Sequence, residues 1–175
     1  GGQDAKYIRL SGREIVDTAM NEACSAGTGS FIEEQGLRLF PDSGIQDLSE
    51  MALSAENGIS LGQHCSVFMA EVIEQAKSAG ENLPSIVAGI YDSVIQNYLN
   101  RVKGPRDIGK KIFCQGMPFS SMALSAAVAR QTGREVVVPP HPGLMGAIGI
   151  ALLAQRHLPS LDAELDLRPC LEATV

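Results

Sequence analysis

The apolar residues between positions 84 and 102 recur at three- and four-residue steps, which is the period of an amphipathic helix. They are Val87, Ile90, Tyr91, Val94, Ile95, Tyr98, Leu99 and Val102. Pro84 suits the first turn, where its missing N–H is not needed, and Gly104-Pro105 ends the pattern. These positions predict one continuous helix over residues 84–102.

The pattern changes to period two near the N-terminus. Apolar and polar residues alternate over residues 6–10, and a second run that resembles a strand covers residues 14–20. Ser11-Gly12, between the two runs, is a turn signal. The two runs therefore predict an antiparallel β-hairpin.

The rest of the chain reads as helices, joined in its second half by short apolar runs. Helices are expected over residues 30–39, 46–54, 67–79 and 121–131, with a last one ending near residue 155. Residues 111–114 and 136–138 are short apolar runs, which we interpret as buried strands. Strands that alternate with helices indicate an α/β layer arrangement, here preceded by the hairpin.

Length, composition and charge narrow the class of protein. A chain of 175 residues, 45% hydrophobic and 19% charged, suits one globular domain. The net charge is −6, and no cluster of Lys or Arg stands out, which argues against nucleic acid or an anionic membrane as a partner. No apolar run approaches the roughly 18 residues of a membrane span. The four cysteines are far apart, which favours a reducing cytoplasm.

The N-terminus opens inside what looks like a motif, without an initiator Met or a signal-peptide pattern. We therefore expect a piece of a longer protein. We assign residues 1–157 to one lobe and residues 158–175 to a tail or linker.

Three glycine-containing turns are candidates for phosphate or nucleotide contacts. Gly1 and Gly2 let backbone N–H groups approach phosphate oxygens, and Asp4 can hold Mg²⁺ through water. Each turn also has an ordinary explanation, because such tetrapeptides are common in loops. The other two turns contain the residues Gly27, Thr28 and Gly29, and Gly116 and Ser121. The first of these precedes a helix, where an anion site and a simple N-cap are both possible.

Two cysteines, Cys24 and Cys65, each stand beside a predicted helix start in a run of small residues. Two thiols are half of a four-thiolate iron–sulfur site, so one chain alone does not complete it. Their spacing alone favours buried or incidental thiols, and a zinc site that includes His64 or an oxidation disulfide are weaker alternatives. Cys114 is expected to be a buried apolar thiol.

The order of these segments resembles one family, the BadF/BadG/BcrA/BcrD ATPases. The resemblance rests on residues 1–6, 21–31, 65–68, 116–121 and 138–149 and extends from residue 1 to about residue 154. The family comprises activators of 2-hydroxyacyl-CoA dehydratases and ATPase subunits of benzoyl-CoA reductases. The fold that it implies is the second lobe of an actin-like (Hsp70/sugar-kinase, RNase H-like) ATPase domain. Residues 6–10 and 97–100 look like its large multidomain members.

The resemblance implies a role for each matched residue. Asp4, with Gly1 and Gly2, falls on the motif that serves Mg²⁺–ATP, and Asp4 is the candidate catalytic residue. Cys24 and Cys65 match the cysteines that hold a 4Fe–4S cluster shared between the two subunits of a homodimer. ATP hydrolysis is then coupled to transfer of a low-potential electron to a CoA-ester dehydratase or reductase.

The adenosine motif departs from the family pattern, which runs Gly-Gly-x-x-x-Asn. Gly116 remains, but Met117 replaces the second glycine and Ser121 replaces the asparagine. A Met side chain at this point would crowd a purine. The family's first phosphate motif is absent from the chain, so we expect the chain alone not to be a complete ATPase.

Three functions remain open at this stage. The first is an iron–sulfur ATPase activator module, whose partners are a second copy or a paralogous module and a dehydratase- or reductase-like protein. The second, favoured by Met117, is a degenerate non-hydrolysing module that serves as a dimerisation or docking scaffold. The third is a phosphotransferase like the sugar kinases, which gives no reason for cysteines before two helices.

Overall fold

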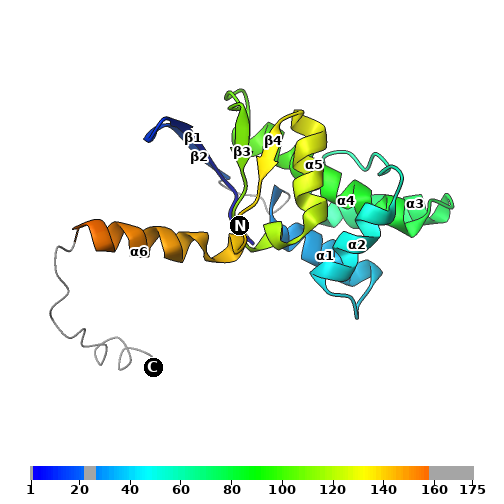
Figure 1. The fold of residues 1–175 in the computed structure, drawn as a ribbon. Coiled ribbons are helices and arrows are strands. Elements are labelled where there is room, and N and C mark those ends of the chain that lie inside the picture. Colours follow the sequence, from blue (N-terminus) through cyan, green and yellow to red (C-terminus); the bar gives the residue numbers. More distant parts are fainter. Residues whose placement is uncertain (1, 22–26, 158–175) are drawn as a thin grey trace. The chain divides into compact units, whose positions relative to one another are not determined.

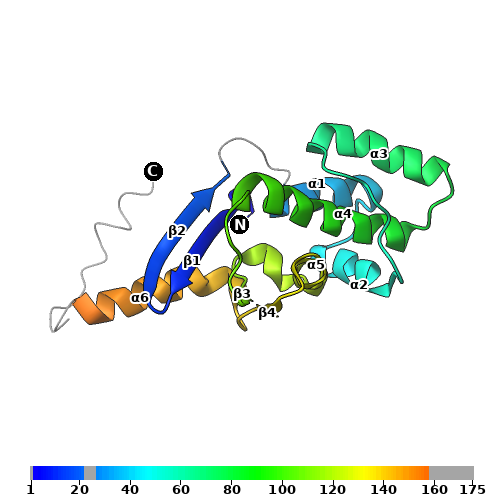
Figure 2. The ribbon, with the colours of Figure 1, turned by 90° about the horizontal axis from the view of Figure 1, so that it is seen from above.

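The computed structural model describes residues 2–21 and 27–157, and it divides the chain into two compact units, Gly1–Gly143 and Leu144–Val175. Within the first unit, helices form the core, and two small sheets lie beside them (Figures 1 and 2). The predicted α/β class therefore agrees with the elements observed.

The N-terminal hairpin forms as predicted. β1 (Lys6–Ser11) pairs antiparallel with β2 (Glu14–Met20), and a register shift falls between Arg9 and Leu10. Gly12 has φ +62°, a value that the tight turn requires and that glycine adopts without strain. Ala5, Tyr7 and Val102 form a small buried cluster, so the hairpin is anchored on the end of the long central helix.

Five helices make up the main core of this unit. They are α1 (Gly29–Leu39), α2 (Ile45–Ser54), α3 (Ser66–Ser78), α4 (Leu83–Asn97) and α5 (Met122–Thr132). α4 packs against each of the others and supplies the largest share of fully buried side chains, as its predicted apolar face requires. Asn82 caps its N-terminus by accepting a hydrogen bond from the Ser85 N–H at 2.9 Å.

The predicted helix over residues 84–102 differs from the structure in its last part. From Tyr98 to Lys103 the chain is a π-helix, η2, and the Gly104 N–H donates to the Leu99 carbonyl. Tyr98 and Val102, both in this wider stretch, pack on the hairpin. The apolar spacing continues through Tyr98, Leu99 and Val102, which is why the sequence predicted a regular helix there.

The second sheet is a parallel pair joined through α5. β3 (Lys111–Phe113) pairs with β4 (Glu135–Val137), and Gly133, at φ +62°, ends α5 before the return strand. The strands were expected to be buried, and this is wrong: Phe113 is 54% exposed, and β4 is buried only in part. In the described part of the chain this sheet has two strands, so both β3 and β4 are edge strands.

The second unit contains α6 (Met145–His157), which follows the short 3₁₀ turn η4 (Pro142–Leu144). α6 is predominantly apolar, and Ile150, Leu152 and Leu153 are about half exposed or more. Among the described residues, none of the helices combines the length and apolar character that crossing a membrane requires. Residues 158–175, the predicted tail, lie outside the described residues, and the boundary after residue 157 stays a prediction.

Candidate functional site

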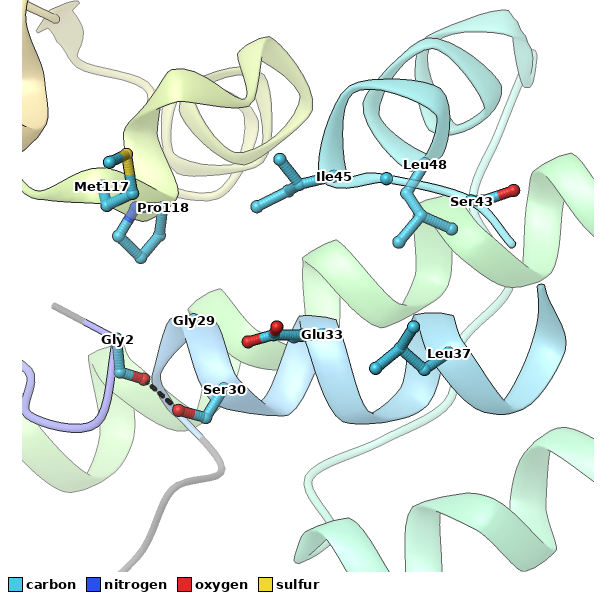
Figure 3. A pocket seen from close by; sticks show the side chains of 11 residues that line it. Gly2, Gly29, Ser30, Glu33, Leu37, Ser43, Ile45, Leu48, Met117 and Pro118 are labelled. Atoms are coloured by element: carbon cyan, nitrogen blue, oxygen red, sulfur yellow. Dashed lines mark hydrogen bonds between the residues drawn. The ribbon is translucent and has the colours of Figure 1, made fainter. Parts of the chain in front are cut away.

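A cavity of about 330 Å³ opens between α1, the start of α2 and the 3₁₀ turn η3 (Met117–Ser120) (Figure 3). Its lining is mostly apolar or small, and Glu33 is the charged member of the set. The lining residues are Gly2, Gly29, Ser30, Glu33, Leu37, Ser43, Gly44, Ile45, Leu48, Met117 and Pro118. The cavity thus brings together all three turns that the sequence singled out, through Gly2, Gly29 and Met117.

The Gly-Gly-Gln-Asp turn is tied to the first turn of α1. Ser30 donates to the Gly2 carbonyl oxygen twice, from its backbone N–H at 2.7 Å and from its hydroxyl at 2.6 Å. Gly2 lines the cavity, and a Cβ at Gly2 would meet no atom within 4 Å, so the turn leaves open space beside it. Asp4 is exposed, and its carboxylate lies 3.8 Å from the Lys6 ammonium. Gly1 lies outside the described residues.

The Gly27-Thr28-Gly29 turn divides between packing and the cavity. A Cβ at Gly27 would lie 3.1 Å from the Tyr98 backbone nitrogen, so this glycine allows a close approach to the central helix. Thr28 is buried at the N-cap position of α1, and its side chain makes no capping hydrogen bond there. Gly29 lines the cavity. Gly29 is therefore the member of this turn that faces the space for a ligand.

The altered adenosine motif forms the opposite wall. Gly116 has φ +109°, a conformation that favours glycine, and its N–H donates to the Pro142 carbonyl at 2.7 Å. Met117 and Pro118 lie across the cavity from Gly29 and Glu33 (Figure 3). The Met117 sulfur lies 3.3 Å from the point where a Cβ on Gly143 would be. Its thioether therefore packs beside Gly143.

Ser121, the last residue of the altered motif, is fully buried and does not line the cavity. Burial raises the pKa of the nearby Tyr91 phenol, and Ser121 offsets part of that rise. Ser121 thus lies in the core directly after η3 and not on the surface of the cavity.

Sequence reasoning missed most of the cavity lining on α1 and α2. Gly29, Glu33 and Leu37 stand at steps of four and share one face of α1. Once Gly29 is taken as a site residue, this spacing identifies the other two. Ser43 precedes α2 and Ile45 is its first residue. No local pattern marks them, because the contact between α1 and α2 brings them to the cavity.

Cys65 stands at the N-cap of α3. Its thiol is free and half-buried, and its carbonyl accepts the Met69 N–H at 2.9 Å, which begins the helix. The preceding loop is fixed to α4, because the Ser93 hydroxyl donates to the Gly62 carbonyl at 2.7 Å. The backbone N–H groups of a first helical turn favour negative charge nearby, as a thiolate ligand requires.

Cys24 lies outside the described residues, and so does any geometry between Cys24 and Cys65. Within residues 2–21 and 27–157, no group of three or more His, Cys, Asp or Glu side chains is placed to hold a metal ion. The donor that is described, Cys65, is of the type that an iron–sulfur cluster takes, at the end of a helix that suits an anion. Cys65 is therefore compatible with a role as one ligand of such a cluster.

Cys114, just after β3, is a buried thiol as predicted. It is 6% exposed, and burial raises its pKa to about 11. A thiol held in its neutral form is poorly suited to bind a metal, because the thiolate is the form that coordinates.

Comparison with known proteins gives consistent results. The sequence profile of the BadF/BadG/BcrA/BcrD ATPase family matches residues 1–154. The 2-hydroxyisocaproyl-CoA dehydratase activator of Clostridioides difficile is 30% identical over 155 residues, which are 88% of this chain and 57% of the activator. The chain thus spans less than two thirds of this relative.

Two solved structures share the fold. The crystal structure of component A of the Acidaminococcus fermentans (R)-2-hydroxyglutaryl-CoA dehydratase has a TM-score of 0.83 at 26% identity, over 91% of this chain and 60% of that one. The activator of the 2-hydroxyisocaproyl-CoA dehydratase from Clostridium difficile, with bound ADPNP, has a TM-score of 0.75 at 28% identity, over 87% and 56%. The predicted fold, a lobe of an actin-like ATPase, is confirmed.

Proposed function

Because this chain belongs to the BadF/BadG/BcrA/BcrD ATPase family, we propose that it is an ATP-dependent iron–sulfur activator module. In this proposal it passes a low-potential electron to a CoA-ester dehydratase or reductase. The observation that carries the proposal is the cavity in which the Gly2 turn, the start of α1 and the η3 wall meet. Relatives with the same fold are named as dehydratase activators, one of them with bound ADPNP.

The charges around the cavity orient a nucleotide within it. The phosphates belong at the Gly2 end, where the first turn of α1 presents backbone N–H groups and a positive helix end. Glu33, one turn further along, repels phosphate and is suited to accept hydrogen bonds from the sugar hydroxyls. Ile45 and Pro118 offer apolar surface to the base. Asp4, near the phosphate turn, is the residue that we assign to hydrated Mg²⁺.

The cluster ligands are Cys24 and Cys65 from each of two copies of the chain. When bound, a 4Fe–4S cluster supplies a one-electron redox centre. Cys65 contributes a thiolate at the N-terminus of α3, and the helix end stabilises the negative charge of that ligand. The loop held by Ser93 fixes the position of Cys65 relative to the core. We place the module in the cytoplasm, with a 2-hydroxyacyl-CoA dehydratase- or benzoyl-CoA reductase-like partner.

Anaerobic reconstitution with iron and sulfide tests the cluster. We expect a brown protein with about four iron atoms per pair of chains. Cys24→Ser and Cys65→Ser should each abolish the colour, while Cys114→Ser, the matched control at a buried thiol, should retain it. Colour that survives the loss of both Cys24 and Cys65 would contradict the proposal.

A second candidate is a non-hydrolysing scaffold, favoured by Met117 in the cavity wall. Calorimetry with Mg–ATP on the wild type and on Met117→Gly separates the two functions. Binding that appears or tightens strongly in the variant supports the scaffold. Tight binding by the wild type excludes it.

A further inference from the structure

The Gly-Gly-Gln-Asp turn is held in place on both sides of Asp4. On one side, the Gly2 carbonyl accepts hydrogen bonds from the backbone N–H and from the hydroxyl of Ser30, and Figure 3 shows the second of these. On the other side, Ala5 exchanges two hydrogen bonds with Asn21, the residue that follows β2. The Asp4 carboxylate itself is exposed, so its place beside the cavity depends on these neighbours.

The Asn21 side chain takes the place of a backbone carbonyl at the end of the hairpin ladder. The Asn21 N–H donates to the Ala5 carbonyl at 3.1 Å, and the Asn21 side-chain oxygen Oδ1 accepts the Ala5 N–H at 2.7 Å. In a regular antiparallel pair both of these bonds join backbone groups. The regular ladder begins one step away, where Lys6 pairs with Met20. Asn21 therefore extends the hairpin by one residue toward Asp4, and one of its two bonds comes from a side chain.

Burial makes this side-chain hydrogen bond difficult to replace with a bond to water. Ala5 is 5% exposed and belongs to the cluster with Tyr7 and Val102 that anchors the hairpin. A buried backbone N–H that loses its acceptor is destabilising, so the chain around it shifts until the N–H is paired again. The Ala5 N–H lies in the same peptide plane as the Asp4 carbonyl. The bond to Asn21 therefore fixes the direction in which the backbone of Asp4 points.

The ion pair between Asp4 and Lys6 does not supply the same constraint. The Lys6 ammonium lies 3.8 Å from the Asp4 carboxylate, and both side chains are more than half exposed. Such surface pairs contribute little to stability and are screened by salt. A divalent cation at the carboxylate would also compete with the ammonium. The backbone bonds to Ser30 and Asn21 therefore decide where the carboxylate is presented.

We propose that Asn21 is a positioning residue for the Mg²⁺–phosphate end of the nucleotide. By accepting the Ala5 N–H, its side chain holds Asp4 where the carboxylate meets hydrated Mg²⁺ on the phosphates. This inference rests on the proposed function, which assigns the phosphates to the Gly2 turn and Mg²⁺ to Asp4. Asn21 is not among the residues that line the cavity, so it acts through the backbone of the turn and not by contact with the ligand.

Calorimetry of ATP binding, with Mg²⁺ and with EDTA in its place, tests this role. We expect Asn21→Ala to weaken Mg–ATP binding by about tenfold or more, as the loss of a group that orients a metal ligand usually does. ATP in EDTA should bind the variant and the wild type alike, because Asp4 acts on the nucleotide through the metal. The gain in affinity on adding Mg²⁺ is thus the quantity that the substitution reduces.

Two further variants separate positioning from stability. Asn82→Ala is the matched control, because the Asn82 side-chain oxygen also accepts a backbone N–H, that of Ser85 at 2.9 Å, and Asn82 does not line the cavity. It should lower the unfolding temperature, as Asn21→Ala does, and leave Mg–ATP binding unchanged. Asn21→Asp keeps an acceptor oxygen at the same place, and its charge does not oppose a cation. It should restore most of the gain in affinity that Mg²⁺ brings.

The same measurements separate failure of this inference from failure of the proposed function. Tight Mg–ATP binding by the wild type that Asn21→Ala leaves unchanged would overturn the inference and keep the function. Equal losses in Asn21→Ala and Asn82→Ala, or a loss of the same size in EDTA, would also overturn it, because the effect would then follow from the fold and not from the metal. A wild type that binds no ATP in either condition would remove the function and the inference together.

Discussion

Glu33 is the charged side chain in the cavity lining, and its negative sign decides which part of a nucleotide it can face. A carboxylate beside phosphates would weaken binding, whereas one beside sugar hydroxyls would strengthen it by accepting hydrogen bonds. The two placements therefore predict opposite effects of removing the charge.

We expect Glu33→Gln to weaken Mg–ATP binding by about tenfold, the loss of one charge-assisted hydrogen bond. Glu34→Gln is the control, because Glu34 is the next residue, pairs with Arg38 at 3.2 Å and does not line the cavity. Calorimetry of both variants measures the effect. Tighter binding by Glu33→Gln would reverse the proposed orientation of the nucleotide.

Cys114 makes the free energy of unfolding depend on pH in the alkaline range. Burial raises its pKa to about 11 from an ordinary value of 9.0, so the folded protein keeps the thiol neutral where the unfolded chain ionises it. Its contribution to stability is complete below about pH 9 and is lost as the pH rises toward 11. The loss approaches roughly 2–3 kcal/mol.

We expect urea unfolding at pH 8 and at pH 10.5 to show this loss in the wild type and a smaller loss in Cys114→Ala. Native alkylation should also modify Cys65 well before Cys114, since Cys114 is 6% exposed and the thiolate is the reactive form. Equal alkylation rates for the two cysteines would contradict the burial of Cys114.

At the scale of elements, Gly89 sets how closely the segment around Ile59 crosses α4. The Ile59 N–H donates to the Ser85 carbonyl at 3.1 Å, and a Cβ at Gly89 would lie 2.5 Å from the Ile59 carbonyl oxygen. A backbone atom cannot move aside as a side chain can. The crossing therefore depends on a glycine inside a helix, despite the low helix propensity of that residue.

Gly89→Ala should lower the free energy of unfolding by about 1–3 kcal/mol, because overpacking outweighs the gain in helix propensity. Gly146→Ala in α6 is the control: a Cβ there meets no atom within 4 Å, and the change should be neutral or stabilising. Thermal unfolding of the two variants compares them. A Gly89→Ala protein as stable as the wild type would show that the crossing segment adjusts freely.

The sequence predicted most elements to within one or two residues of their ends. Periodicity identified α4, and turn and helix-breaking residues placed the other helices and the hairpin, because these signals are local in the chain. It did not reveal the π-helix that begins at Tyr98, where the hairpin packs. Nor did it reveal the exposure of Phe113, because an apolar run records the character of a strand and not the number of its neighbours.

The sequence predicted the cavity residues that belong to motifs, but not those that tertiary packing brings to the cavity. Gly2, Gly29 and Met117 were found from their motifs and do line the cavity. Ile45 and Leu48 were not, since they reach the cavity only through the packing of α2 on α1.

At the scale of the whole molecule, the cavity that we propose for a nucleotide and the end of α3 that carries Cys65 are linked through α1. Gly27 and Gly29 stand at the start of α1, the one packed against Tyr98 and the other open to the cavity. α1 packs in turn on α3, whose cap is Cys65. The elements that would sense the nucleotide and hold the cluster are thus direct neighbours in the core.

Native mass spectrometry of the anaerobically reconstituted protein tests the central claim, which is that two copies share one cluster. We expect a dimer that carries a single 4Fe–4S unit, and monomers without iron when Cys65 is replaced by serine. A cluster retained on a single chain, or a dimer of unchanged abundance that carries none, would contradict it.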